Sequence, residues 1–115
     1  MIFKFDGNLD EALARGGIFD ITGTAAVIDK QFFGFTPSDG AVLAVIKGVP
    51  VAVSTNLKTL AAIRAAEVDL AAFFLTALTD PLTDDFYRVD GHIITYVQFA
   101  SGTGRFYKTI SQVTT

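Results

Sequence analysis

Few side chains in this sequence have the types and spacing that catalysis requires. His92 is the only histidine, and a Ser–His–Asp arrangement would need a serine nucleophile beside it. No serine stands in the Gly-x-Ser-x-Gly pattern of a nucleophile elbow. Because Asp90 and Gly91 predict a turn directly before it, we interpret His92 as a surface residue at the start of a strand. The serines, which lie far from His92 in sequence or in predicted turns, are Ser38, Ser54, Ser101 and Ser111.

The sequence also contains no clear motif for binding a metal ion or a phosphate group. With no cysteine and no second histidine, the chain lacks the ligands of a catalytic zinc site. Asp80, Asp84 and Asp85 could gather around a calcium ion, because hard cations take carboxylate oxygens. Their spacing matches no EF-hand loop, so solvated loop carboxylates are the simpler interpretation. Residues 101–105, SGTGR, resemble a phosphate-binding loop, but a β-type run follows them where a P-loop needs a helix. We expect a hairpin turn there, and no cofactor or metal.

Phenylalanine provides the most prominent pattern, with eleven in the chain. Two groups stand out, one in residues 32–35 and one at 73–74. Such residues could line an aromatic ligand pocket, but they more often form a core or an interface between identical subunits. We predict a subunit contact surface made by Phe32, Phe33, Phe35, Phe73 and Phe74.

A second hypothesis is a small ligand-binding module or enzyme with its pocket between the helices and the sheet. Such a site needs polar groups that converge on a concave apolar surface. Four side chains on neighbouring predicted strands could supply them: Arg88, His92, Tyr96 and Tyr107.

Composition restricts the classes of partner. Half of the 115 residues are hydrophobic and only 18% are charged. A domain of this size cannot bury so many apolar side chains in its own core. We therefore predict a homo-oligomer, with a trimer favoured. A net charge of −3 and nine dispersed basic residues argue against nucleic acid. The uncharged stretch 70–79 is about half of the roughly 20 residues that cross a bilayer, and residues 1–8 lack the features of a signal peptide. We expect no membrane association.

The elements that must carry these residues are mainly β. Apolar runs at 25–35, 41–46 and 49–53 alternate with turn residues at 36–40 and at Lys47 and Gly48. We predict an inner strand at 41–46 and an edge strand at 49–53, because Pro50 cannot donate a ladder hydrogen bond. Phe33 and Phe35 should share one strand face, with Gly34 at a bulge or a close approach.

The two ends of this central stretch carry further predicted elements. Residues 1–5 alternate as an edge strand or docking arm, a short helix begins near Asn8, and 18–22 form a strand. Helical spacing returns in 56–66, and Asp69 could cap a second helix. One bent helix, two helices, or a strand over 68–75 all remain open. After the loop 79–85, we predict a strand at 86–89 and a hairpin that pairs 92–100 with 105–113.

One pattern resembles a known class of protein. Residues 21–24 (ITGT), 32–37 (FFGFTP) and 39–46 (DGAVLAVI) are similar to the opening of small virion proteins of tailed bacteriophages, and residues 87–97 to their closing strand. The similarity spans about 20–54 and 86–108, and the helical insertion departs from the simplest versions. This resemblance implies a capsid decoration, cement or fibre-base protein, a trimeric β-sandwich without enzymatic activity.

Taken together, the sequence predicts one β-rich domain over residues 1–115, with an N-terminal arm and short helix in 1–17. The fold class is mainly β (α+β), a small antiparallel β-sandwich or barrel with one or two short helices inserted around 56–78. The predicted function is a non-enzymatic assembly protein of the virion, made in the host cytoplasm, that oligomerises and binds a larger viral protein lattice.

Overall fold

The computed structural model describes residues 17–28, 30–51 and 59–108. They form a six-stranded antiparallel sheet of order β1-β6-β2-β5-β3-β4, with one α-helix and one 3₁₀ turn, which confirms the predicted mainly β class. The predicted elements in residues 1–16 lie outside these ranges. The strands are β1 (Ile18–Ile21), β2 (Phe32–Pro37), β3 (Val42–Pro50), β4 (Val68–Asp69), β5 (His92–Ser101) and β6 (Gly104–Lys108).

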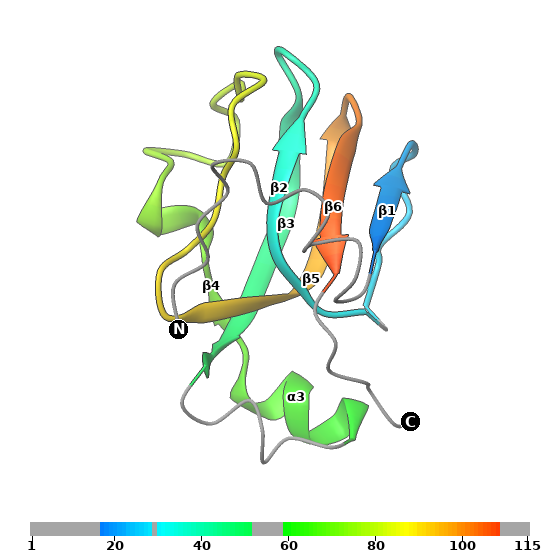
Figure 1. Cartoon of the computed structure of the whole chain (residues 1–115). Coiled ribbons are helices and arrows are strands. Elements are labelled where there is room, and N and C mark those ends of the chain that lie inside the picture. Colours follow the sequence, from blue (N-terminus) through cyan, green and yellow to red (C-terminus); the bar gives the residue numbers. More distant parts are fainter. Residues whose placement is uncertain (1–16, 29, 52–58, 109–115) are drawn as a thin grey trace.

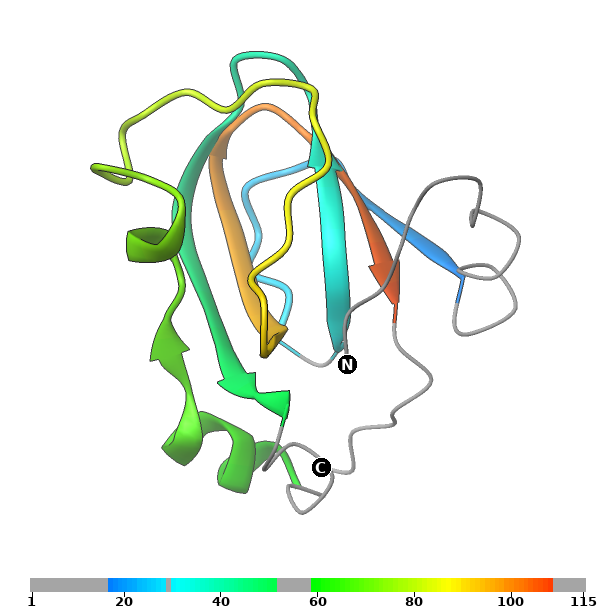
Figure 2. The ribbon, with the colours of Figure 1, turned by 60° about the vertical axis from the view of Figure 1, so that its left-hand side comes forward.

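The sheet bends into two layers at one end, where two chain reversals lie side by side. Residues 38–41 link β2 to β3, and residues 102–103 link β5 to β6. The backbone N–H of Ser38 donates to the carbonyl of Thr103 over 2.8 Å, and the Thr103 N–H donates to Ser38 Oγ over 3.0 Å. A Cβ on Gly102 would lie 2.6 Å from that of Ala41, and its φ of +86° also requires glycine. Figure 2 shows β3, β4 and β5 on one side of the resulting arch and β1, β2 and β6 on the other.

A β-bulge lets β2 belong to both layers. Its first residue, Phe32, pairs both with Ile94 of β5 and with Lys108 of β6. After a register shift between Phe32 and Gly34, the rest of the strand pairs with β6 alone. Bulges of this kind reorient a strand and its side chains. Phe32 and Phe35 therefore both join the core cluster, whereas Phe33 is buried outside that cluster against Tyr107. The prediction that Phe33 and Phe35 share a face is wrong, because the bulge interrupts strict alternation.

Gly34 sits at this bulge as predicted. A Cβ there would lie 2.2 Å from Phe86 Cζ and 3.0 Å from the Tyr87 carbonyl oxygen. That carbonyl accepts a hydrogen bond from Phe35 N–H, and Tyr87 N–H donates back to Phe35. Only this single bridge forms where we expected a strand at 86–89, so that prediction is wrong.

The β3 strand is one continuous element rather than two strands separated by a turn. It runs through Lys47 and Gly48 and pairs along its length with β5. Gly48 serves close packing here, since a Cβ on it would lie 2.1 Å from the carbonyl oxygen of Ile93. The predicted turn at Lys47 and Gly48 is therefore wrong, and the glycine marks a crowded backbone instead.

The predicted hairpin between β5 and β6 is also wrong. Gly102 and Thr103 do reverse the chain, but β6 pairs with β1 and β2, and β5 pairs with β3 and β2. The reversal is thus a corner between the two layers. Residues 109–113 of the predicted partner strand lie outside the described ranges.

The described part of the insertion contains one α-helix and one 3₁₀ turn, in agreement with the predicted one or two short helices. The α-helix α3 (Leu60–Ala66) is capped by Thr59, whose side chain accepts from Ala62 N–H. After β4, the 3₁₀ turn η1 (Ala71–Phe73) follows, with Asp69 Oδ1 accepting from Ala71 N–H. The second helix that Asp69 could cap is therefore this short 3₁₀ turn and not an α-helix. Residues 52–58, which include the start of the predicted first helix, are not described.

Candidate functional site

The predicted aromatic contact surface divides into buried and exposed parts. Phe32 and Phe35 are fully buried, and Phe33 is 5% exposed. Phe32 and Phe35 belong to the core between the layers, and Phe33 packs against Tyr107 outside it. None of the three rings offers surface to a partner in the single chain. What remains of the predicted surface is the pair Phe73 and Phe74.

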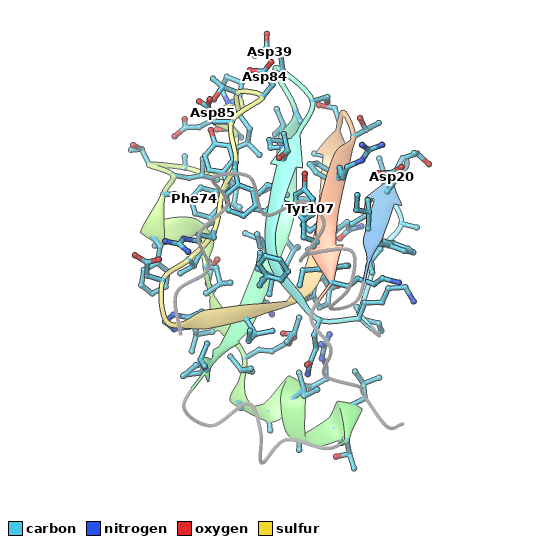
Figure 3. All side chains as sticks on the ribbon, in the orientation of Figure 1. Asp20, Asp39, Phe74, Asp84, Asp85 and Tyr107 are labelled. Carbon is cyan, nitrogen blue, oxygen red and sulfur yellow. The ribbon has the colours of Figure 1, made fainter. Side chains whose placement is uncertain are left out.

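These two neighbours in sequence have opposite environments. Phe73 is 58% exposed and lies at the end of η1, with its ring 5.1 Å from that of His92. Phe74 turns toward the core, with its ring 6.2 Å from Phe35 and 5.4 Å from Tyr87 (Figure 3). The tight 3₁₀ geometry lets adjacent side chains point in different directions, so only Phe73 is free to bind another molecule.

Phe73 belongs to a surface segment without charge. Residues 70–79, which we call the apolar segment, carry no Asp, Glu, Lys or Arg. Its start is anchored by the buried Leu70 and Ala71, whereas Ala72, Phe73 and Ala77 are exposed. Val68 of the adjacent strand β4 is 41% exposed. Figure 1 and Figure 2 place this region on the side of the molecule opposite β1.

The four polar residues of the ligand-pocket hypothesis do not converge. Arg88 Nε pairs with Asp90 over 3.3 Å, and His92 lies against Phe73. On another part of the surface, the Tyr96 ring lies beneath Lys47 and Arg64. Tyr107 packs between Phe33 and Phe86 on the β6 layer. Arg88 and His92 thus share Asp90 as a neighbour, since His92 Nδ1 lies 3.2 Å from the Asp90 carbonyl oxygen. Tyr96 and Tyr107 have other neighbours, so the described residues do not bring all four together.

Arg64 and Glu67 attach α3 to the sheet. Arg64 Nη2 bonds to Glu67 Oε2 at 2.5 Å and to the Thr95 carbonyl at 2.9 Å, and Thr95 Oγ1 donates to the same Glu67 oxygen at 2.5 Å. The Glu67 side chain is 4% exposed and Thr95 is 1% exposed. These groups are paired with one another at the helix–sheet contact, which indicates a structural role.

A polar groove that the sequence reasoning missed lies on the outer face of β1, β6 and β2. It has a volume of about 480 Å³. Strand register places Asp20, Arg105 and Thr36 in one row across the three strands. Its lining comprises Asp20, Ile21, Thr22, Thr36, Pro37, Ser38, Thr103, Gly104, Arg105 and Tyr107.

An ion pair occupies the middle of the groove. Arg105 Nε donates to Asp20 Oδ1 over 3.0 Å, and both side chains are about half exposed. The hydrogen bond to Asp20, then the charge of that carboxylate, raises the pKa of Arg105 above its ordinary value. The two residues are far apart in sequence and only β1–β6 pairing brings them together, so no local motif could reveal them.

The acidic loop residues do not form a metal site in the described part of the chain. Asp80 Oδ2 accepts the backbone N–H groups of Thr76 and Ala77, each at 3.0 Å. Asp85 accepts the Thr83 hydroxyl at 2.9 Å, and Asp84 stands exposed at the loop tip (Figure 3). Over residues 17–28, 30–51 and 59–108, no three acidic, histidine or cysteine side chains are grouped to hold a metal ion.

Comparison with known proteins identifies no relative. No protein-family model matches the chain, and neither a curated protein nor a solved structure is significantly similar to it. Within the described ranges, no helix has the length and apolar character needed to cross a membrane.

Proposed function

We propose that this chain is a non-enzymatic assembly protein, a virion component of the capsid decoration, cement or fibre-base type. In this proposal it forms a homo-oligomer, with a trimer favoured, and binds a larger protein lattice. The observation that carries the proposal is the exposure of Phe73 within the charge-free apolar segment. Monomeric proteins rarely leave such apolar surface in water, and contiguous patches mark interaction sites.

The energetics favour a protein partner for this surface. Fully burying a phenylalanine side chain contributes about 1.5–3 kcal/mol, and aromatic residues dominate the binding energy of interfaces. One ring is not enough for a stable contact, which needs roughly 800 Å² on each partner. Val68, Ala72 and Ala77, which lie within five residues of Phe73 in the sequence, are also exposed and could add to the contact.

The backbone near Phe73 supports the same proposal. Strand β4 is the last strand of the sheet and pairs with β3 through only two residues, Val68 and Asp69. An edge strand next to an exposed aromatic ring allows a partner to combine main-chain hydrogen bonds with an apolar contact. A second subunit bound there would extend the sheet.

The first test is the solution mass, measured by light scattering behind a sizing column. We expect a closed oligomer for the wild-type chain and a monomer for Phe73→Asp, because the carboxylate would be buried in the contact. Thr24→Asp adds the same charge at an exposed position elsewhere and should leave the oligomer intact. If the wild-type chain stays monomeric at all accessible concentrations, the proposal that it forms a homo-oligomer is wrong.

A second measurement addresses the lattice. Sedimentation with undecorated shells of tailed phages should pellet the wild-type chain and the Thr24→Asp control but not Phe73→Asp. If the chain does not sediment with any of the shells tested, the virion assignment is wrong. The proposed homo-oligomer is not affected by that result.

A further inference from the structure

The groove on the β1-β6-β2 layer is separate from the proposed contact surface. We propose that it is a binding site for a neutral carbohydrate, one or two sugar rings of a glycan. Figure 3 shows Asp20 at the right of the view and Phe74 at its left, with Tyr107 nearer the middle. The two surfaces can therefore be occupied at the same time, and this site goes beyond the assembly function.

The charges of the groove select a neutral ligand. Asp20 and Arg105 compensate each other at 3.0 Å, so the centre of the groove carries no net charge. An inorganic anion would have to compete with Asp20 for Arg105, and a metal cation would meet the guanidinium beside the carboxylate. A sugar avoids both penalties, because its hydroxyl groups donate to a carboxylate and accept from a guanidinium.

The ion pair leaves hydrogen-bonding capacity for such a ligand. The bond uses Nε of Arg105 and Oδ1 of Asp20. Among the contacts of the described residues, Oδ2 of Asp20 and the two Nη groups of Arg105 have no other assigned partner, and both side chains are about half exposed. Hydroxyl groups of Thr22, Thr36 and Thr103 add short donors and acceptors along the walls.

Apolar atoms complete the site. Tyr107 is half-buried and lines the same groove, whose floor includes the buried Ile21 and Pro37, so a C–H face of a sugar ring would find an aromatic partner beside the polar groups. A few placed polar groups in a partly apolar concavity are typical of small-molecule sites, whose volumes run from about 300 to 1,000 Å³. The 480 Å³ of this groove suits one or two sugar rings.

The side chains that line the groove are held by rigid elements. Arg105 is paired through its strand with both neighbours, Asp20 on β1 and Thr36 on β2. At one end, the paired backbone groups of Ser38 and Thr103 fix the corner. A site on paired strands loses little conformational entropy when a ligand binds.

The test is an NMR titration of the ¹⁵N-labelled full chain with a panel of neutral monosaccharides and disaccharides at millimolar concentrations. We expect saturable shifts of the Asp20, Thr36 and Arg105 amides for at least one sugar. Asp20→Ala should weaken that binding about tenfold or more, because it removes charge-assisted hydrogen bonds. Asp90→Asn breaks another exposed ion pair, outside the groove, and should not change the affinity.

Three outcomes would overturn the proposal. The first is that no sugar in the panel shifts the amide signals of the groove. The second is that the shifts persist unchanged in both Asp20→Ala and Thr36→Val. The third is that these amide signals shift with inorganic phosphate or calcium chloride and not with a sugar. Spectra of the variants without ligand verify their folding, since Asp20 lies on the surface. Because the groove lies apart from Phe73, the Phe73→Asp variant should bind the same sugar, so this test and the solution-mass test can fail independently.

Discussion

The rings of Phe35 and Phe106 stack nearly parallel inside the arch, with centroids 4.6 Å apart and planes inclined by 6°. The two residues are direct partners across β2 and β6, and neither is exposed to solvent. Phe32 and Phe99 lie against Phe106 from β2 and β5, at centroid distances of 4.9 and 6.1 Å. This ring cluster joins the two layers and contains four of the eleven phenylalanines of the chain.

We predict that Phe106→Ala lowers the free energy of unfolding by about 3–5 kcal/mol, as for other buried phenylalanines. Phe35→Ala should have a similar effect. The double variant should lose less than the sum, because each single change already removes the contact between the rings. Urea unfolding followed by circular dichroism measures these values. Phe73→Ala is the matched control and should change stability little; a loss equal to that of Phe106→Ala would contradict the described core.

The crowding at Gly48 gives a second prediction. In Gly48→Ala the new methyl group would lie 2.1 Å from the Ile93 carbonyl oxygen and 2.7 Å from Leu70 Cδ1. A backbone carbonyl in a paired strand cannot move without opening the ladder, so we expect a loss of about 3 kcal/mol. Gly23→Ala meets nothing within 4 Å and serves as control in the same thermal-melt series. Equal stability of the two variants would show that β3 and β5 are not this close.

The contact between α3 and the sheet gives a third prediction, which concerns Thr95. Thr95→Val keeps the shape of the buried side chain but removes the hydroxyl that donates to Glu67. Glu67 Oε2 keeps its bond to Arg64, so the variant loses one hydrogen bond to a charged group. Such a bond contributes about 1.5–3 kcal/mol, and the unfolding midpoint should fall accordingly. Thr22→Val, at an exposed position, should leave the midpoint nearly unchanged. Faster amide exchange in α3 of the Thr95 variant would localise the effect, whereas unchanged exchange would argue against this anchor.

Asp80 gives a fourth prediction. Its carboxylate accepts the N–H groups of Thr76 and Ala77 and so closes the end of the apolar segment. In Asp80→Ala we expect faster hydrogen exchange at these two amides and a loss of about 1 kcal/mol, similar to the loss of a helix cap. Asp84→Ala, four residues further along the same loop, is the control. Protection that persists in Asp80→Ala would mean that other groups order the segment.

Local sequence determined the β-rich class because β-branched and aromatic runs between Gly, Pro and Asp turns favour strands whatever their partners are. It also predicted the turn positions at Asp39 and Gly40, at Gly91 and at Gly102, where backbone dihedrals depend on the residue itself. The close approach at Gly34 was predicted for a different reason, namely that a glycine inside a strand pattern has no Cβ to keep a neighbour away.

Only the tertiary structure decided which strands pair and which aromatic rings are exposed. Because of the bulge at Gly34, Phe32 lies on the same face as Phe35. Because of the corner at Gly102, β6 pairs with β1 and β2 and not with β5. Phe73 and Phe74 have the same local propensity, yet Phe74 is partly buried against Phe35 and Tyr87 whereas Phe73 is exposed to water. The groove at Asp20 and Arg105 likewise exists only through strand register, because long-range pairing depends on the whole fold and leaves no trace in local residue spacing.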